Sequence, residues 1–148
     1  MSDRIAVMND GRIDQLDTPE AIYNNPKTVF IADFIGETNL LKGKVRSFQE
    51  NDAIIEIFGH KFKTNRNVNF KLEEQVNVSI RPENLIISDE NSYFKGVVKE
   101  ILFAGSVRKL LVDIHRGEEV AIILKDDNKY YTGQEVGITW KNEPVILS

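Results

Sequence analysis

Residue types that commonly carry out chemistry are sparse in this 148-residue chain. Its two histidines, His60 and His115, stand apart, with no cysteine in the chain and no carboxylate at a metal-ligand spacing. The acidic pairs at 73–74, 118–119 and 126–127 fall in expected loops, where solvated surface explains them better than cation binding. The chain lacks a Gly-x-Ser-x-Gly turn, a His-Glu-x-x-His pair and a phosphate-binding glycine loop. We therefore predict no catalytic, cofactor-binding or metal-binding residue in this chain.

One stretch places two charged residues at a corner between apolar strands. In VSIRPENLIIS (78–88), Pro82 lacks a backbone N–H and cannot join a central ladder, so the chain must turn there. Arg81 can pair with Glu83, or with a carboxylate across an interface. Two roles stay open for this corner, a structural bend and a contact site. Arg81, Pro82 and Glu83 are therefore the candidate interface residues.

The charge of the chain is unevenly distributed along its length. The net charge is −4. Residues 1–39 hold three basic and seven acidic residues, whereas residues 40–148 hold 16 of each and balance. Neither part has the strongly basic face of a nucleic-acid binder, so we expect no nucleic-acid partner.

The cysteine content and the apolar runs limit the cellular setting. With no cysteine, disulfides and thiolate metal sites are excluded. No apolar run approaches the roughly 20 residues that span a bilayer, and no basic-then-apolar leader opens the chain. We expect a cytoplasmic protein that does not insert into the membrane.

The first 36 residues predict a β-hairpin followed by two short helices. Alternating apolar residues flank Asn9-Asp10-Gly11, and Asp-Gly favours the positive φ angles of a tight hairpin turn. Thr18 followed by Pro19 predicts the cap and first turn of one helix. Asn25 followed by Pro26 predicts the start of a second helix that ends at Gly36. Its apolar side chains lie four residues apart, as Phe30/Phe34 and Ile31/Ile35.

From residue 40 onward, apolar residues alternate with a period of two, which is typical of strands. Turn-forming clusters fall about every 8–12 residues, a spacing typical of a small all-β barrel or sandwich. Two similar blocks, LLKGKV (40–45) and YFKGVV (93–98), indicate a weak internal repeat. The expected strands are 41–48, 53–58, 60–64, 76–81, 85–88, 94–103, 107–115, 119–124, 136–140 and 145–147.

These segments together resemble a known family. The stretch MSDRIAVMNDGRIDQLDTPEAIYNNPKTVFIADFIGETNLL resembles the end of the ATPase domain of ABC importers, and SIRPENL resembles the corner of their transport-associated OB (TOBE) domain. FIGETNLL, GSVRKLLVDI and GQEVGITWKNEPVIL resemble the polyamine branch, of the spermidine/putrescine import type. The resemblance implies a mainly β fold, with a remnant of the ATPase domain in 1–39 and an OB-like barrel for regulation and dimerisation in 40–148.

The resemblance also implies partners and cofactors. In that family the nucleotide-binding motifs and the switch histidine precede the part that resembles this chain, so ATP and Mg²⁺ belong to the parent protein. We expect this chain to be no enzyme by itself. Its partners would be a second copy of itself and, in the parent, the permease subunits at the inner face of the membrane. Because unpaired strand edges and an apolar helix need partners, we expect residues 1–36 to pack on the barrel or to exchange with a second copy.

Two other functions stay open at this point. Relatives of the OB-like domain bind small ligands, so the barrel could sense one, and the acidic pair at 126–127 could meet a polycation. The parent could also serve a sugar or iron importer, since those ATPases share much of the pattern. Calorimetry with spermidine would separate a ligand sensor from a purely dimerising domain.

Overall fold

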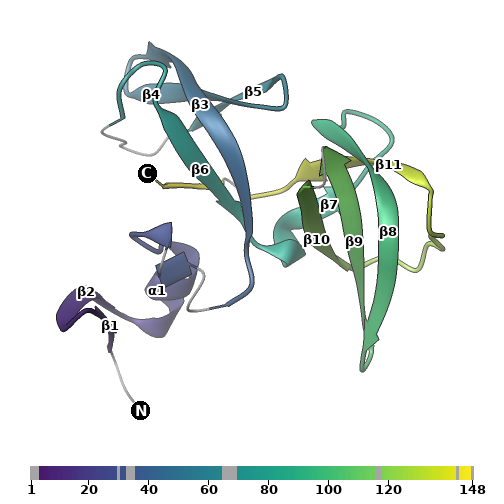
Figure 1. The fold of residues 1–148 in the computed structure, drawn as a ribbon, viewed down its shortest axis with the longest axis horizontal. Helices are drawn as coiled ribbons and strands as arrows, with labels where there is room; N and C mark the ends of the chain where they lie inside the picture. Colours follow the sequence, from purple (N-terminus) through teal and green to yellow (C-terminus); the bar gives the residue numbers. More distant parts are fainter. Residues whose placement is uncertain are drawn as a thin grey trace. The chain divides into compact units, whose positions relative to one another are not determined.

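The computed structural model describes residues 4–29, 31–32, 36–64, 70–115, 118–142 and 144–147. The fold is mainly β, as predicted, and Figure 1 shows its strands in chain order. Contacts divide the chain into two compact units. The first unit holds Met1–Ile57, Lys61–Ser79 and Pro144–Ser148, and the second holds Phe58–His60 and Ile80–Glu143. This division does not test the predicted domain boundary between residues 39 and 40, which stays a prediction.

The N-terminal hairpin forms as its sequence predicts. Strand β1 (Ile5–Asn9) pairs antiparallel with β2 (Arg12–Asp17). Asp10 and Gly11 make the turn with φ angles of +52° and +76°, the left-handed pair that a primed turn requires. Val7 is buried in a small core with Ile22 and Ile31. The remaining large apolar side chains of the hairpin are exposed: Ile5, Met8, Ile13 and Leu16.

Helix α1 (Pro19–Asn24) follows the hairpin and is capped as expected. The side chain of Thr18 accepts a hydrogen bond from the backbone N–H of Ala21, and Glu20 lies in the first turn, where it complements the helix dipole. The short length of the helix matches the sequence, because the chain leaves the helix at Asn25.

The start of the second helical segment was predicted wrongly. Thr28, not Asn25, caps it, because the Thr28 side chain accepts from the backbone N–H of Ile31. The buried side chain of Gln15 instead holds the link between the helical segments, accepting from the N–H of Lys27 and donating to the C=O of Asn25. A long-range amide thus overrides a local capping signal. The predicted partners Phe30, Phe34 and Ile35 lie outside the described residues.

The first unit contains a five-stranded antiparallel sheet in the order β12-β6-β3-β4-β5. Buried and more exposed side chains alternate along the strands, as in residues 52–57, where every second side chain is buried. The hydroxyls of Thr38 and Ser79 lie 2.7 Å apart and join the segment before β3 to β6. The strands are β3 (Asn39–Gln49), β4 (Asp52–Ile57), β5 (His60–Thr64), β6 (Gln75–Ile80) and β12 (Val145–Leu147).

The second unit contains another five-stranded sheet, in the order β10-β9-β8-β11-β7. Leu110, Val112, Val120 and Ile138 are fully buried in it. The strands are β7 (Leu85–Ile87), β8 (Phe94–Ala104), β9 (Val107–His115), β10 (Glu118–Leu124) and β11 (Glu135–Trp140). The strand positions predicted from alternation agree with all ten strands of the two sheets to within two residues.

The two sheets share one topology, and each takes its fifth strand from the other repeat. In both, a long first strand pairs with the second and the fourth, and the third strand forms one edge. β7 follows the four strands of the first sheet in the chain but pairs with β11 of the second. β12 follows the strands of the second sheet but pairs with β6 of the first. The similarity of LLKGKV and YFKGVV therefore reports a structural duplication with exchanged fifth strands.

Backbone details repeat in both sheets. The first hairpin of each sheet shifts register two residues after its Lys-Gly pair, between Val45 and Ser47 and between Val98 and Glu100. Val45 exchanges backbone hydrogen bonds with residues 73 and 74, and Val98 does so with residues 133 and 134. A bulge at the same place strengthens the twist that curls each sheet toward a barrel.

Candidate functional site

The predicted interface residues lie on the link by which the chain passes from β6 to β7. Pro82–Asn84 form a single turn of 3₁₀ helix, η1, with Arg81 as its extended N-terminal flank. Arg81 is 7% exposed and Pro82 is buried, whereas Glu83 is half-buried. The corner is therefore a structural bend, as Pro82 suggested, with Glu83 as its more accessible side chain. The interface role of Arg81, Pro82 and Glu83 stays a prediction.

A second link, after β11, lies beside this corner. The backbone N–H of Lys141 donates to the C=O of Asn84 at 3.2 Å, and the Asn142 side-chain amide donates to Asn84 Oδ1 at 2.9 Å. Asn84 thereby holds the two crossing segments together. The sequence contains no local sign of this contact, because 58 residues separate Asn84 from Asn142.

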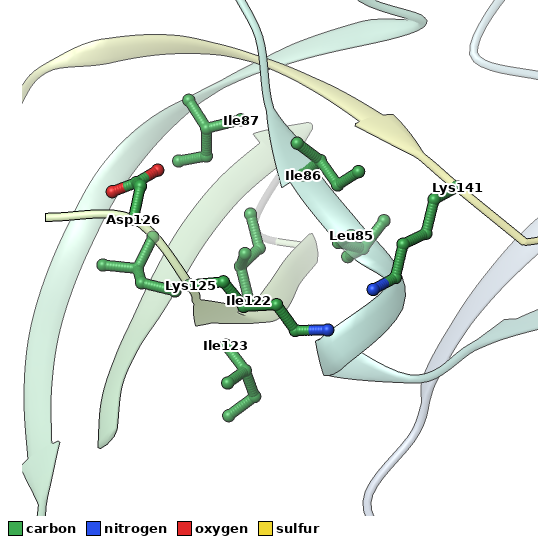
Figure 2. Close-up of a pocket in the computed structure, with 9 residues that line it drawn as sticks. Leu85, Ile86, Ile87, Ile122, Ile123, Lys125, Asp126 and Lys141 are labelled. Atoms are coloured by element: carbon green, nitrogen blue, oxygen red, sulfur yellow. The ribbon is translucent and has the colours of Figure 1, made fainter. Parts of the chain in front are cut away.

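A pocket opens where the two edges of the second sheet approach each other. β7 and β10 are its edge strands, and β10 contacts both η1 and β7. We call the cavity between them the seam pocket; its volume is about 250 Å³. Figure 2 shows the side chains from β7 and β10 around it. It is lined by Leu85, Ile86, Ile87, Ile122, Ile123, Leu124, Lys125, Asp126 and Lys141.

Two lysines meet at the seam pocket. Figure 2 shows the amines of Lys125 and Lys141 pointing toward each other. Contact with the amine of Lys125 and like-charge repulsion from it lower the pKa of Lys141, and the opposing attraction of Glu83 is smaller. The local field at this end of the pocket is therefore positive.

Asp126, the carboxylate that lines the seam pocket, contacts Arg108 and its own loop. Asp126 lies 3.6 Å from Arg108 Nη2 and accepts hydrogen bonds from the Asn128 N–H and the Tyr130 hydroxyl. The Arg108 guanidinium also donates to the backbone carbonyls of Asp126 and Asn128. These contacts hold the loop after β10 in place. They also engage the Asp126 carboxylate with Arg108 and its own loop.

An aromatic cluster surrounds His60 in the second unit. His60 stacks on Tyr93 with ring centroids 4.1 Å apart, and Trp140 meets Tyr93 edge-on at 4.6 Å. Partial burial lowers the pKa of His60 below its ordinary value. His60 thus serves packing here, as expected for a strand histidine, while the side chain of His115 lies outside the described residues.

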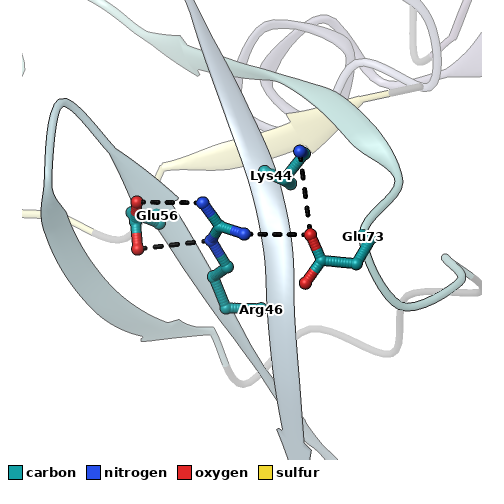
Figure 3. Close-up of polar contacts among 4 residues, drawn as sticks. All are labelled: Lys44, Arg46, Glu56 and Glu73. Atoms are coloured by element: carbon teal, nitrogen blue, oxygen red, sulfur yellow. Dashed lines mark hydrogen bonds and ion pairs between the residues drawn. The ribbon is translucent and has the colours of Figure 1, made fainter.

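The first unit carries a network of exposed ion pairs (Figure 3). Arg46 on β3 lies 3.3 Å from Glu56 and 2.9 Å from Glu73, and Lys44 lies 3.7 Å from Glu73. The hydrogen bond and charge of Glu56, with a lesser contribution from Glu73, raise the pKa of Arg46. One member of each acidic pair noted in the sequence makes a similar contact: Glu73 with Arg46, Glu119 with Lys99 at 3.0 Å, and Asp126 with Arg108.

Among the residues that the structure describes, no three His, Cys, Asp or Glu side chains converge as a metal site would require. No helix in that part of the chain is long and apolar enough to cross a membrane.

One family model matches the C-terminal part of the chain. Residues 78–147 match the family model described as the TOBE domain. The chain spans about two-fifths of the length of the curated relatives it matches, and it aligns with their C-terminal part. The resemblance to ABC importer ATP-binding subunits that carry a TOBE domain is thereby confirmed.

Relatives from distant bacteria carry one name. Spermidine/putrescine import ATP-binding protein PotA from Borreliella afzelii is 35% identical over 91% of this chain and 42% of its own length. The protein of that name from Thermotoga maritima is 32% identical over 99% of this chain and 41% of its own length. The one from Trichormus variabilis is 37% identical over 83% and 34%.

A solved structure confirms the OB-like fold. The cytoplasmic molybdate-binding protein ModG, crystallised with molybdate bound, superposes with a TM-score of 0.56 over 73% of this chain and 94% of its own. The two sequences are only 12% identical, so the likeness establishes the fold alone.

Proposed function

We propose that this chain is the regulatory and dimerising C-terminal part of the ATP-binding subunit of an ABC importer for polyamines. The observation that carries the proposal is its alignment, over most of its length, with subunits named for spermidine and putrescine import. The parent protein would bind ATP and Mg²⁺ and couple hydrolysis to uptake. This chain by itself would hold neither cofactor and would catalyse nothing.

The N-terminal hairpin supports a role within a larger ATPase domain. Met8, Ile13 and Leu16 are 59%, 58% and 52% exposed, a high fraction for apolar side chains on one short hairpin. An isolated two-stranded sheet is marginal in water. Contiguous exposed apolar surface commonly marks a contact with another element or protein. The ATPase sheet of the parent, or a second copy of this chain, would supply such a contact.

The second unit offers a surface for dimerisation at the end of its longest hairpin. Phe103 and Val107 flank the turn between β8 and β9, and they are 75% and 41% exposed. Burial of an exposed aromatic side chain against a second copy is a common source of interface energy. In the parent, this copy would belong to the second ATP-binding subunit, with the permease subunits placing the complex at the inner face of the membrane.

The proposal is tested by the gene and then by transport. The reading frame upstream of residue 1 should encode a phosphate loop, a signature motif and a switch histidine. The longer subunit, reconstituted with its permease in vesicles, should hydrolyse ATP in response to spermidine and import it. Uptake of maltose or ferric iron but not spermidine would overturn the polyamine assignment.

The dimerising role needs a separate measurement. The 148-residue chain should sediment as a concentration-dependent dimer, and Phe103→Ser should shift it toward monomer. Phe48→Ser, at a phenylalanine of the first unit that is 48% exposed, is the control. A wild-type chain that sediments as a monomer at every concentration would contradict the proposal.

A further inference from the structure

The seam pocket combines an apolar wall with a positive end. Leu85 and Ile122 are buried at its wall, at 2% and 1% exposure, while Ile86 is 39% exposed beside them. Lys125 and Lys141 bring two ammonium groups to the same cavity. The pocket is thus amphipathic, with aliphatic surface on one side and cationic groups on the other.

We propose that the seam pocket binds a small organic carboxylate with a short aliphatic chain. The aliphatic chain lies against the isoleucines and leucines of β7 and β10, and the carboxylate lies between the amines of Lys125 and Lys141. The site is formed by residues 85–87, 122–126 and 141 of this chain, so the proposal does not depend on the proposed transport function.

Charge selects an anion for this pocket. Two ammonium groups held close together repel each other, and the repulsion from Lys125 outweighs the attraction of Glu83 at Lys141. A carboxylate between them would replace that repulsion with two charge-assisted hydrogen bonds. A polyamine would add to the repulsion instead, so this pocket does not suit the cation that the relatives are named for.

The Asp126 carboxylate, which could compete with a ligand for the two lysines, already has other partners. Asp126 lies against Arg108 and accepts hydrogen bonds from its own loop. Its carboxylate therefore has partners that hold it away from the lysine amines.

Size and lining select a short aliphatic chain. Typical ligand pockets measure about 300–1,000 Å³, so a volume of about 250 Å³ suits a ligand smaller than a drug. The side chains of Leu85, Ile87, Ile122 and Leu124 offer no hydrogen-bond partner to a sugar or a base. A monocarboxylate of about six carbons matches both the volume and the lining.

The test follows the isoleucine methyl groups by NMR while the 148-residue chain is titrated with hexanoate. Resonances of Ile86, Ile122 and Ile123 should shift and saturate, and those of Ile54 and Ile55 in the first unit should stay in place. Hexan-1-ol and hexylamine have the same carbon chain with a neutral and a positive end. Hexan-1-ol should bind about tenfold more weakly, since the charge-assisted contacts are lost, and hexylamine more weakly still, since its ammonium group adds to the repulsion.

Variants test the lysines directly. Lys125→Gln combined with Lys141→Gln should weaken hexanoate binding by about tenfold or more. Lys95→Gln, at an exposed lysine 3.9 Å from Glu135 in the same sheet, should leave it unchanged. Both lysines of the pair are exposed, so the double variant should keep the unliganded methyl spectrum of the wild type.

Three results would overturn the proposal. Equal binding of hexan-1-ol and hexanoate to the wild type would show that the lysines take no part. Equal binding of inorganic phosphate would show that the apolar wall takes no part and that the site is a simple anion site. Absence of saturable shifts at millimolar hexanoate would show that the pocket binds no such ligand.

Discussion

The two five-stranded sheets are copies of one plan that differ in how their links are built. Each has a long bulged first strand, an edge third strand and a fifth strand exchanged with the other repeat. The first link, Arg81–Asn84, is a proline-containing turn of 3₁₀ helix, and its counterpart begins at Lys141 and Asn142. In the second sheet, Lys141 in the link and Lys125, which follows the edge strand β10, come together at one pocket.

Glycine usage shows a second difference between the sheets. An added Cβ at Gly43 in β3 would meet three methyl groups at 3.1–3.2 Å, whereas one at Gly96 in β8 would lie 2.4 Å from Val112 Cγ1. Gly137 in β11 is tighter still, with the backbone oxygen of Ser88 2.3 Å from the added atom. Its counterpart in β6 is Asn77, which pairs with Leu147 of β12. The segment between β7 and β8 lies against β11 and leaves no room for a side chain at Gly137. The two repeats therefore differ at this position.

The exchanged fifth strands give the largest expected contrast. Leu85, the first residue of β7, is 2% exposed, whereas Val145, the first residue of β12, is half-buried. Leu85→Ala should lower the free energy of unfolding by about 3 kcal/mol, because it removes a buried leucine side chain and enlarges the adjoining seam pocket. Val145→Ala should cost about 1 kcal/mol. Urea unfolding of both variants measures the contrast, and equal costs would break the distinction between the two strands.

The glycine of β11 gives the next largest effect. Gly137→Ala should destabilise the chain by about 2 kcal/mol, since the new methyl group overlaps the Ser88 carbonyl. Asn77→Ala at the matching position of β6 should change stability by less than about 0.5 kcal/mol. Thermal unfolding of the pair checks this. A tolerated Gly137→Ala would show that the 88–93 segment moves away at little cost.

The turn before each fourth strand gives a smaller contrast between the two sheets. Glu73 has a φ of +66° and its counterpart Gly133 has +93°, both in the left-handed region. Gly133→Glu should cost about 1 kcal/mol of backbone strain. Glu73→Gly should leave stability nearly unchanged, because relief of that strain offsets the lost ion pairs with Arg46 and Lys44. Chemical unfolding in low and high salt separates the two contributions to the Glu73 variant.

A pH dependence localised to the second unit is the smallest expected effect. Burial lowers the pKa of His60 below its ordinary value of 6.5, so the unfolded chain takes up the proton more readily. The contribution of His60 to stability is therefore complete above pH 6.5 and is lost as the pH falls below that value toward the folded pKa. Trp140, whose ring lies 6.0 Å from His60, reports the change by fluorescence. His60→Gln should flatten the dependence between about pH 5 and pH 7, and an unchanged profile would exclude His60 as its source.

The elements that depend on neighbouring residues could be predicted from the sequence. Asp10-Gly11 selects a primed turn by itself, and Thr18-Pro19 starts a helix within four residues, so both were predicted correctly. The second helical start was predicted wrongly because the side chain of Gln15 reaches across 10 and 12 residues to the backbone of Asn25 and Lys27. No local rule identifies such an interaction.

The candidate site was predictable only in part. Pro82 marked the corner between β6 and β7, because a missing N–H is readable in sequence. The facing amines of Lys125 and Lys141 were not predicted, since Lys125 follows β10 and Lys141 follows β11, the two segments being separated in the sheet order by β9 and β8. Only the curl of the sheet brings them to one pocket.

The sequence by itself determined the elements of this protein. Alternating apolar residues and turn-forming clusters set the strands, because side-chain direction along a strand and left-handed turn angles depend on neighbouring residues. The tertiary structure decided which strands pair, which fifth strand each sheet receives and which charges meet. These choices depend on contacts between residues far apart in the chain. Such contacts stabilise the protein only when both sheets have formed, so no local sequence pattern specifies them.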